Sequence, residues 1–219
     1  MGVKMDSVKY HKKYWDKYAN EKDFVISLQY EKFTAYVKNN DKILDVGCGY
    51  GRTLNELYHN GYKFLNGVDI SKNIIERGLK QYPYLNLKVQ EYNKIPYEDS
   101  MFDTVVLISV LTCIIGNEEQ DTLIREIKRV LKPKGVVCIS DFIINKDERN
   151  LQRYNNALEK YGVYGAFELS DGGVFRHHSI ERVGQICSNF QEVLFEEKNY
   201  KTMNGNDCNG FYYIGRNIK

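Results

Sequence analysis

The sequence predicts an α/β fold in which a largely parallel sheet is covered by helices on both faces. Two patterns in the 219-residue chain lead to this prediction. First, apolar strand-like runs alternate with amphipathic helical runs, which is typical of repeated strand–helix–strand units. Second, the strand-like runs are almost continuously apolar, as strands buried on both faces are. The chain is 42% hydrophobic, so it can bury the core of one such domain with elaborations.

Seven segments are expected to be strands. Five of them make up the parallel part of the sheet and lie at residues 42–47, 63–70, 85–92, 102–109 and 135–143. The last two, at 192–200 and 210–217, are joined by a short link that contains an Asn-Gly pair, which favours a tight hairpin turn. We therefore expect an antiparallel hairpin near the end of the sequence.

Helices are expected between the strands. Amphipathic runs place them at residues 53–60, 72–81, 118–131, 151–161 and 179–189. Ser71 is the expected N-cap of the second helix, and Asn117 with Gln120 can form a capping box at the start of the third. The sequence "KPKG" that follows is expected to stop this third helix and turn the chain.

Two additions to this single domain of residues 1–219 are expected. Residues 1–40 read as an N-terminal helical cap, because Tyr10, Tyr14 and Tyr18 recur at every fourth position of an amphipathic helix. Residues 145–176 are polar, rich in Tyr and Gly, and too long for a simple connection. Long loops in compact domains are usually lids or binding segments, so we expect a lid insertion here, with one helix followed by loop.

Composition excludes several classes of protein. A net charge of +2 gives no field that favours nucleic acid or a membrane surface. The five cysteines are scattered and show no Cys-x-x-Cys or Cys/His spacing, so neither a disulfide framework nor a metal site is indicated. Reduced thiols fit the cytoplasm. No run resembles a signal peptide or is long enough to span a bilayer. A cytoplasmic protein without a nucleic-acid or membrane partner is therefore expected.

The sequence "ILDVGCGYG" carries the clearest functional signal. Gly47, Gly49 and Gly51 follow a buried strand directly. A tight turn into a helix needs residues without Cβ there, both to adopt positive φ and to let a ligand touch the backbone. One strand later, Asp69 ends "FLNGVDI", where its carboxylate can accept hydrogen bonds from a ribose diol. The pattern indicates a nucleoside site at the carboxyl ends of the strands.

The spacing of this turn distinguishes it from a dinucleotide site. The turn is one residue shorter than G-x-G-x-x-G, and Asp45 precedes its first glycine by two positions. A buried carboxylate repels a pyrophosphate and suits a cationic ligand. S-adenosylmethionine, which carries a sulfonium and an ammonium group, fits this requirement.

Four motifs in order resemble the class I S-adenosylmethionine-dependent methyltransferases, in particular the bacterial small-molecule type. They are "ILDVGCGYG", "GVDIS", "EYNKIPYEDSMFDTVVLISVL" and "REIKRVLKPKGVVCISDF". The resemblance runs from about Tyr14 to the C-terminus. It implies a Rossmann-like seven-stranded sheet flanked by helices on both faces with the last strand antiparallel, S-adenosyl-L-methionine as cofactor, and methyl transfer.

The resemblance also implies roles for individual residues. The residues it places at the methionine part of the cofactor are Tyr14, Asp45, Gly47, Cys48, Gly49 and Arg52. Asp69 is expected to hold the ribose, Ile70 to pack on the adenine, and Ser109 to lie beside the sulfonium. Glu91 and Tyr92 occupy the place where the family commonly has Asp-Ala, and Glu91 is expected at the adenine amino group.

The function expected from this reading is transfer of a methyl group to an oxygen or nitrogen atom of a small molecule by in-line displacement. Methylation of nucleic acid or protein is an alternative, although "SVLTCI" stands where amino-methylating nucleic-acid enzymes carry Asn/Asp-Pro-Pro-aromatic. A non-catalytic cofactor-binding protein is another. No catalytic residue is assigned, and His177, His178 and Asp141 stay open as candidate bases.

Overall fold

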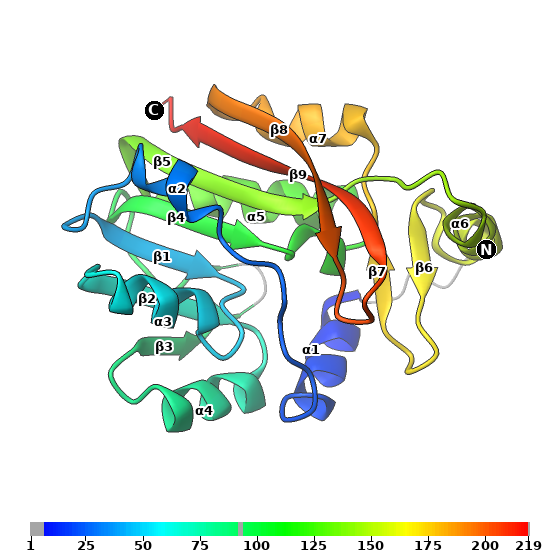
Figure 1. Cartoon of the computed structure of the whole chain (residues 1–219), viewed down its shortest axis with the longest axis horizontal. Helices are drawn as coiled ribbons and strands as arrows, with labels where there is room; N and C mark the ends of the chain where they lie inside the picture. The colour runs from blue at the N-terminus through cyan, green and yellow to red at the C-terminus, as the bar shows by residue number, and fades with distance from the viewer. Residues whose placement is uncertain (1–6, 92–93, 219) are drawn as a thin grey trace.

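The computed structural model describes residues 7–91 and 94–218, and a seven-stranded sheet forms its centre (Figure 1). The strand order is β3-β2-β1-β4-β5-β9-β8. The strands are β1 (Lys42–Val46), β2 (Phe64–Asp69), β3 (Asn86–Val89), β4 (Phe102–Ile108), β5 (Leu131–Phe142), β8 (Gln191–Lys201) and β9 (Asp207–Arg216).

The direction of these strands confirms the predicted Rossmann-like arrangement. The pairs that link β3, β2, β1, β4 and β5 are all parallel. The last strand, β9, runs antiparallel to both of its neighbours, with Ile139 of β5 opposite Tyr213. The chain order reverses between β1 and β4, and in such sheets ligands bind in the crevice outside the carboxyl ends at this point.

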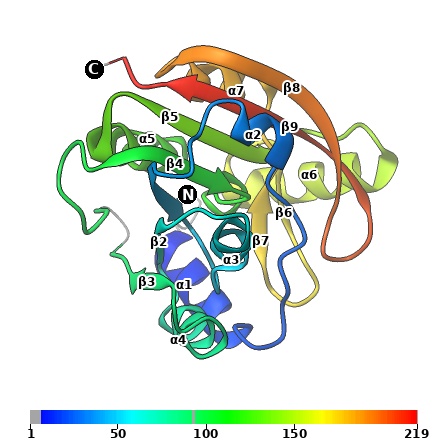
Figure 2. The ribbon, with the colours of Figure 1, turned by 60° about the vertical axis from the view of Figure 1, so that its left-hand side comes forward.

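Helices cover both faces, and the alternation of side chains along the strands explains why. On β5, Val136 and Cys138 face the core under α2 (Tyr30–Thr34), α3 (Arg52–His59) and α4 (Lys72–Gln81). Val137 and Ile139 face the opposite core, which is closed by α5 (Asn117–Val130) and α7 (Ile180–Cys187). Because successive residues of a strand point to opposite faces, one apolar run supplies two cores. Figure 2 shows the two layers from the side.

The start of α5 differs from the predicted capping box. Its N-cap is Gly116, which has no side chain to offer, and Asn117 is the first helical residue. Gln120 instead donates from Nε2 to the carbonyl oxygens of Leu111 and Ile114, at 3.2 and 2.7 Å. The helix does end just before the "KPKG" segment, at Val130, but this segment lies within β5, which starts at Leu131.

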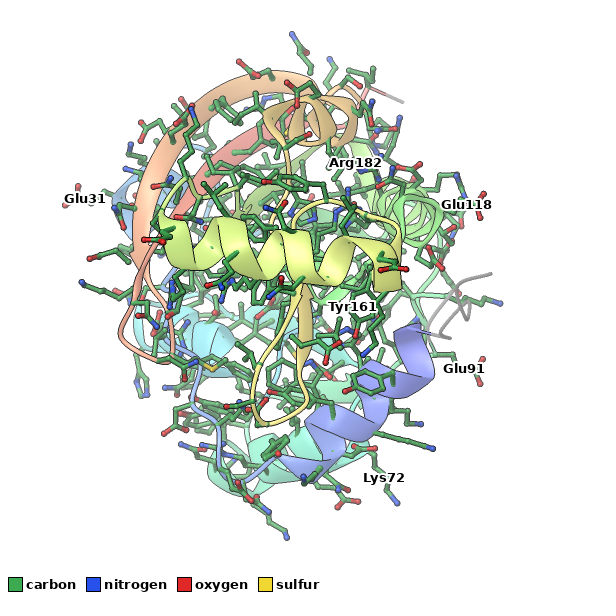
Figure 3. All side chains as sticks on the ribbon, turned by 90° about the vertical axis from the view of Figure 1, so that its right-hand side faces the viewer. Glu31, Lys72, Glu91, Glu118, Tyr161 and Arg182 are labelled. Carbon is green, nitrogen blue, oxygen red and sulfur yellow. The ribbon has the colours of Figure 1, made fainter. Side chains whose placement is uncertain are left out.

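The insertion between β5 and α7 is more structured than the sequence indicates. The helix α6 (Glu148–Tyr161) starts three residues earlier than predicted, at an N-cap formed by Asp147. The segment expected to be loop contains two short strands, β6 (Ala166–Glu168) and β7 (Val174–Arg176), which pair antiparallel. Figure 3 shows α6 lying across this hairpin, with Tyr161 at its C-terminal end.

The N-terminal helix α1 (Ser7–Lys17) packs against the turn of this β6–β7 hairpin. The hydroxyl of Tyr14 bonds both carboxylate oxygens of Asp171, at 3.1 and 3.2 Å. Tyr18 donates to the carbonyl oxygen of Asp171 at 3.0 Å, and Tyr10 donates to that of Gly172. We call these contacts the tyrosine latch. The predicted tyrosine stripe therefore also holds the insertion.

Among the described residues, no helix has both the length and the apolar character needed to cross a bilayer.

Candidate functional site

One large pocket lies at the carboxyl ends of β1, β2 and β4 and continues under the inserted hairpin. Its sheet-edge half is lined by residues from the strand ends, which include Asp45, Gly47, Asp69, Ile70 and Ser109. Its aromatic half is lined by Phe142, Phe167, Phe175, His177 and Cys208, with the β8–β9 loop at residues 202–206 beside them. The two halves form a single interior space.

The glycine turn has the backbone that the sequence predicts. Gly47, Gly49 and Gly51 have φ values of 71°, 55° and 87°, the region that favours glycine. A Cβ on Gly47 would lie 2.4 Å from a methyl carbon of Val110. The turn is thus left-handed and closely packed, which lets a ligand approach its backbone.

Asp45 supplies a buried carboxyl group to the sheet-edge half. Its side chain is only 3% exposed, and burial raises its pKa to about 8, opposed by the charge of Arg52 and reinforced by that of Asp69. Such a group is unfavourable as a free anion. A cationic ligand would stabilise the ionised form, which is the property expected of a site for a sulfonium and an ammonium group.

Asp69 is tied to the glycine turn. One of its carboxylate oxygens accepts a hydrogen bond from the backbone N–H of Gly49 at 3.0 Å, and the other accepts from Ser71 at 2.9 Å. Burial raises its pKa to about 6, while these two backbone donors oppose the rise. Each carboxylate oxygen can accept more than one bond, so Asp69 can hold the turn and still contact a diol.

Three polar atoms at this end of the pocket have no hydrogen-bond partner. They are Oε1 of Gln90, Oγ of Ser109 and Nε of Arg52. Arg52 Nη1 lies 2.5 Å from Glu56, and its Nη2 donates to the carbonyl oxygen of Ile26. Buried polar groups are rarely left unpaired. Together with the acidic residues and the glycine turn, these atoms fit a polar, cationic nucleoside.

The structure places most, but not all, of the predicted cofactor residues in the pocket lining. The predicted residues that line it are Asp45, Gly47, Cys48, Arg52, Asp69, Ile70 and Ser109. Gly49 reaches the site through its N–H bond to Asp69. Tyr14 points to Asp171 instead, and Glu91 is exposed at the edge of the molecule (Figure 3). Tyr92 lies outside the described residues.

Gln90 and two residues of α1 line the pocket without having been predicted. Gln90 occupies the end of β3 where Glu91 was expected. His11 and Trp15 face the pocket from α1, beside the predicted Tyr14. His11 is 2% exposed, neither ring nitrogen has a partner, and burial lowers its pKa to about 4. His11 and Trp15 are four residues apart on an amphipathic helix, and this spacing could have indicated their shared face. The tyrosine repeat on the same helix obscured it.

The three candidate bases have different surroundings. His177 lines the aromatic half, and its Nδ1 lies 2.6 Å from the hydroxyl of Tyr154. His178 is fully buried, with Nδ1 3.1 Å from the carbonyl oxygen of Phe142 and Nε2 2.8 Å from Gln120. Burial lowers the pKa of His178 to about 3 and that of His177 well below its usual value. Both imidazoles are neutral at physiological pH.

Asp141 is buried outside the pocket lining. Its carboxylate accepts from the backbone N–H of Phe142 at 2.8 Å and from that of Thr112 at 3.2 Å. It also lies 4.0 Å from Nδ1 of His178. Asp141 thus fixes the short helix η1 (Leu111–Cys113) after β4 and has a structural role.

Three of the five cysteines line the pocket, namely Cys48, Cys113 and Cys208, and all five are free thiols. Among the described residues, no group of three or more potential ligands is placed to hold a metal ion.

Comparison with known proteins agrees with this geometry. Residues 44–139 match the family model of a methyltransferase domain. The structure superimposes on that of a SAM-dependent methyltransferase from Methanosarcina mazei with a TM-score of 0.83 and 25% identity, covering 88% of this chain and 99% of that one. Residues 44–139 therefore form a methyltransferase domain, and the fold is that of a SAM-dependent methyltransferase. S-adenosyl-L-methionine is accordingly the cofactor of this methyltransferase domain.

Curated relatives of this methyltransferase differ in what their names say they methylate. A sterol 4-C-methyltransferase of Caenorhabditis elegans is 32% identical over 185 residues, which cover 81% of this chain and 51% of the relative. An eEF1A lysine and N-terminal methyltransferase of Mus musculus is 26% identical over 145 residues, 58% of this chain and 21% of the relative. The chain spans about half the length of the first relative and about a fifth of the second.

Proposed function

We propose that this methyltransferase transfers the methyl group to an oxygen or nitrogen atom of a small molecule. The observation that carries the proposal is the single interior pocket, whose aromatic half continues directly from the acidic sheet-edge half. Phe142, Phe167 and Phe175 make the aromatic half largely apolar, as sites for small organic molecules are.

The residues of the sheet-edge half are proposed to bind the cofactor, with Asp45 facing its positive charges and Asp69 facing its ribose diol. Asp45 and Asp69 are the carboxylates of this half, and the N–H of Gly49 keeps Asp69 in place. S-adenosylmethionine supplies an activated methyl group when bound. The chain then has to align the acceptor with it and exclude water. Holding reacting atoms roughly 3 to 3.5 Å apart can lower a barrier by on the order of 7 to 11 kcal/mol.

Residues 145–176 are proposed to act as a lid over the acceptor, and residues 1–40 as a cap. The tyrosine latch between α1 and the β6–β7 turn supports this proposal, because releasing it would expose the pocket from one side. A cytoplasmic location is also proposed, supported by five free cysteines.

The test has two parts. Calorimetry of the purified protein is expected to detect binding of S-adenosylmethionine and S-adenosylhomocysteine, and no binding of NAD. Incubation with methyl-labelled cofactor and cell extract is then expected to put the label into the small-molecule fraction. Label recovered only in protein or nucleic acid would refute the acceptor class and leave the methyltransferase assignment intact. Label in neither fraction, with the cofactor bound, would favour a non-catalytic cofactor-binding protein.

A further inference from the structure

Two arginines on one face of α6 reach the aromatic half of the pocket. Arg149 and Arg153 are four residues apart, so they lie on the same side of the helix, and both line the pocket. Their charges both depress the pKa of His177, after the larger effect of burial. They therefore act on the same interior space from one helix.

The guanidinium group of Arg153 contacts the aromatic residues Phe167 and Tyr154, and no salt bridge pairs it with a carboxylate among the described residues. It stacks on the ring of Phe167, with its central carbon 3.5 Å from the ring centroid. Its Nε atom is buried and has no hydrogen-bond partner. Arg149 lies 3.8 Å from a carboxylate oxygen of Asp147, and both of these side chains are about half exposed. Exposed pairs of this kind are weak and leave a guanidinium available to another anion.

The charges in the pocket are separated. Its lining carboxylates, Asp45 and Asp69, belong to the sheet-edge half. Among the described lining residues, the aromatic half has Arg149 and Arg153 but no acidic side chain. A cation close to apolar surface is costly unless a counter-ion or hydrogen-bond acceptors compensate it. The main chemical feature of this half is therefore a pair of arginines without an acidic side chain beside them in the described pocket lining.

We infer that the methyl acceptor carries a carboxylate or phosphate group, which binds Arg149 and Arg153 at the aromatic end of the pocket. A planar guanidinium forms paired hydrogen bonds with both anions, and stacking on Phe167 holds that of Arg153 in one orientation. The inference rests on the proposed function, because it assumes that the acceptor occupies this half. It adds the class of the acceptor, an aromatic or otherwise apolar organic acid.

The experiment uses small aromatic probes and the full chain saturated with S-adenosylhomocysteine. Phenylacetate and phenyl phosphate carry the anion, and phenylacetamide is the neutral match to phenylacetate. Calorimetric titration is expected to give tighter binding for at least one anionic probe than for the amide. The variant with both Arg149→Gln and Arg153→Gln should bind that anionic probe at least about tenfold more weakly, as expected for loss of a charge-assisted bond. The better of the two anions shows which group the site prefers.

Matched variants make the result specific. Arg125→Gln removes the same charge from an exposed position on α5, outside the pocket lining, and should leave probe binding unchanged. Arg149→Gln alone, at an exposed position, covers the case in which loss of Arg153 prevents folding. Equal binding of acid and amide, no binding of either acid, or full binding by the arginine variants would overturn the inference. Binding of S-adenosylhomocysteine, measured in the same samples, tests the cofactor site separately.

Discussion

The ionised carboxyl groups of Asp45 and Asp69 are expected to lower the stability of the free protein and to favour cofactor binding, and both effects can be measured. Both carboxyl groups are buried, and burial raises their pKa values to about 8 and about 6. A carboxyl group whose pKa is higher in the folded than in the unfolded chain contributes its full stabilisation below the unfolded pKa of about 3.9. This contribution is lost as the pH rises from there through the folded pKa. Without cofactor, the fold should therefore lose stability between about pH 4 and pH 8.

The first prediction concerns Asp45→Asn. Because the wild-type side chain is protonated in both the folded and the unfolded chain only below about pH 4, the variant should match the wild-type Tm at about pH 3.5 and exceed it by a growing margin up to about pH 8.5. It should bind S-adenosylmethionine about ten- to a hundredfold more weakly, since a charge-assisted contact is lost. Thermal melts across pH and calorimetry measure the two effects.

Asp141→Asn is the matched control for this prediction. Asp141 is also buried, with its pKa raised to about 7, but it lies outside the pocket lining. Asn keeps an oxygen that can accept from the backbone of η1, so this replacement should weaken cofactor binding far less than Asp45→Asn does. A constant Tm difference between Asp45→Asn and wild type at every pH would show that Asp45 is not the group that titrates.

The second prediction concerns Asp69→Ala. Sequence alone predicts only the ribose contact, but the structure adds two hydrogen bonds from the backbone N–H groups of Gly49 and Ser71. Leaving a buried donor unpaired costs about 1 to 3 kcal/mol. We expect Asp69→Ala to lower the Tm without cofactor by several degrees, in addition to weakening cofactor binding about a hundredfold.

Asp69→Asn separates the two roles of this residue. It keeps one carbonyl oxygen as an acceptor for the turn and removes the charge, so it should recover part of the lost Tm while binding stays weak. An unchanged Tm in Asp69→Ala would mean that the turn does not depend on this side chain.

At the scale of elements, the tyrosine latch joins α1 to the inserted hairpin and gives the third prediction. Asp171 accepts from Tyr14, from Lys22 at 2.5 Å and from the backbone N–H of Gly173 at 3.0 Å. Asp171→Ala removes all three acceptor contacts, so proteinase K should cut the β6–β7 turn several times faster than in wild type.

Asp207→Ala is the control for the latch. Asp207 also pairs with a lysine, Lys201, at 2.7 Å, but both side chains are about two-thirds exposed, so the loss should matter little. Binding of S-adenosylhomocysteine should slow cleavage of the wild-type turn if residues 145–176 close over the ligand. Equal cleavage of Asp171→Ala and wild type would contradict the latch.

Elements were predictable from the sequence where their pattern is local. The helix at 72–81 has its predicted bounds, and Ser71 caps it by accepting from the N–H of Ile74. The β6–β7 hairpin was missed because each strand has only three residues, too few to show an alternation. The role of Gln120 was also missed, since its partners include His178 and Arg182, some sixty residues away.

At the scale of the whole molecule, the sheet-edge half of the pocket was predictable and the aromatic half was not. Parallel strands bring their carboxyl ends to one edge, so Asp45, Asp69 and Ser109 meet there whatever the loops do. The aromatic half is assembled from α1, the end of β5, the inserted hairpin and the β8–β9 loop. No local pattern indicates that His11 and Phe167 line the same space, because only tertiary packing joins these segments.

The five cysteines lie in different parts of the molecule, so alkylation of their thiols can report on each part separately. Cys48 and Cys113 line the pocket near the glycine turn and η1, Cys208 lines the aromatic half, and Cys138 and Cys187 are buried in the two cores. Burial raises the pKa of Cys208 to about 11 and that of Cys138 to about 12, so alkylation of the native protein should be slow at all sites.

Each end of the pocket can therefore be followed by mass spectrometry without changing a residue. Saturation with S-adenosylhomocysteine should slow iodoacetamide labelling of Cys48 and Cys113, whereas an occupant of the aromatic half should slow that of Cys208. Cys138 and Cys187 serve as internal references, because they react only when the cores open. Equal protection of all five thiols would instead indicate that the ligand reduces opening of the whole fold. The pattern of protected thiols thus locates an unidentified acceptor in the pocket before its structure is solved.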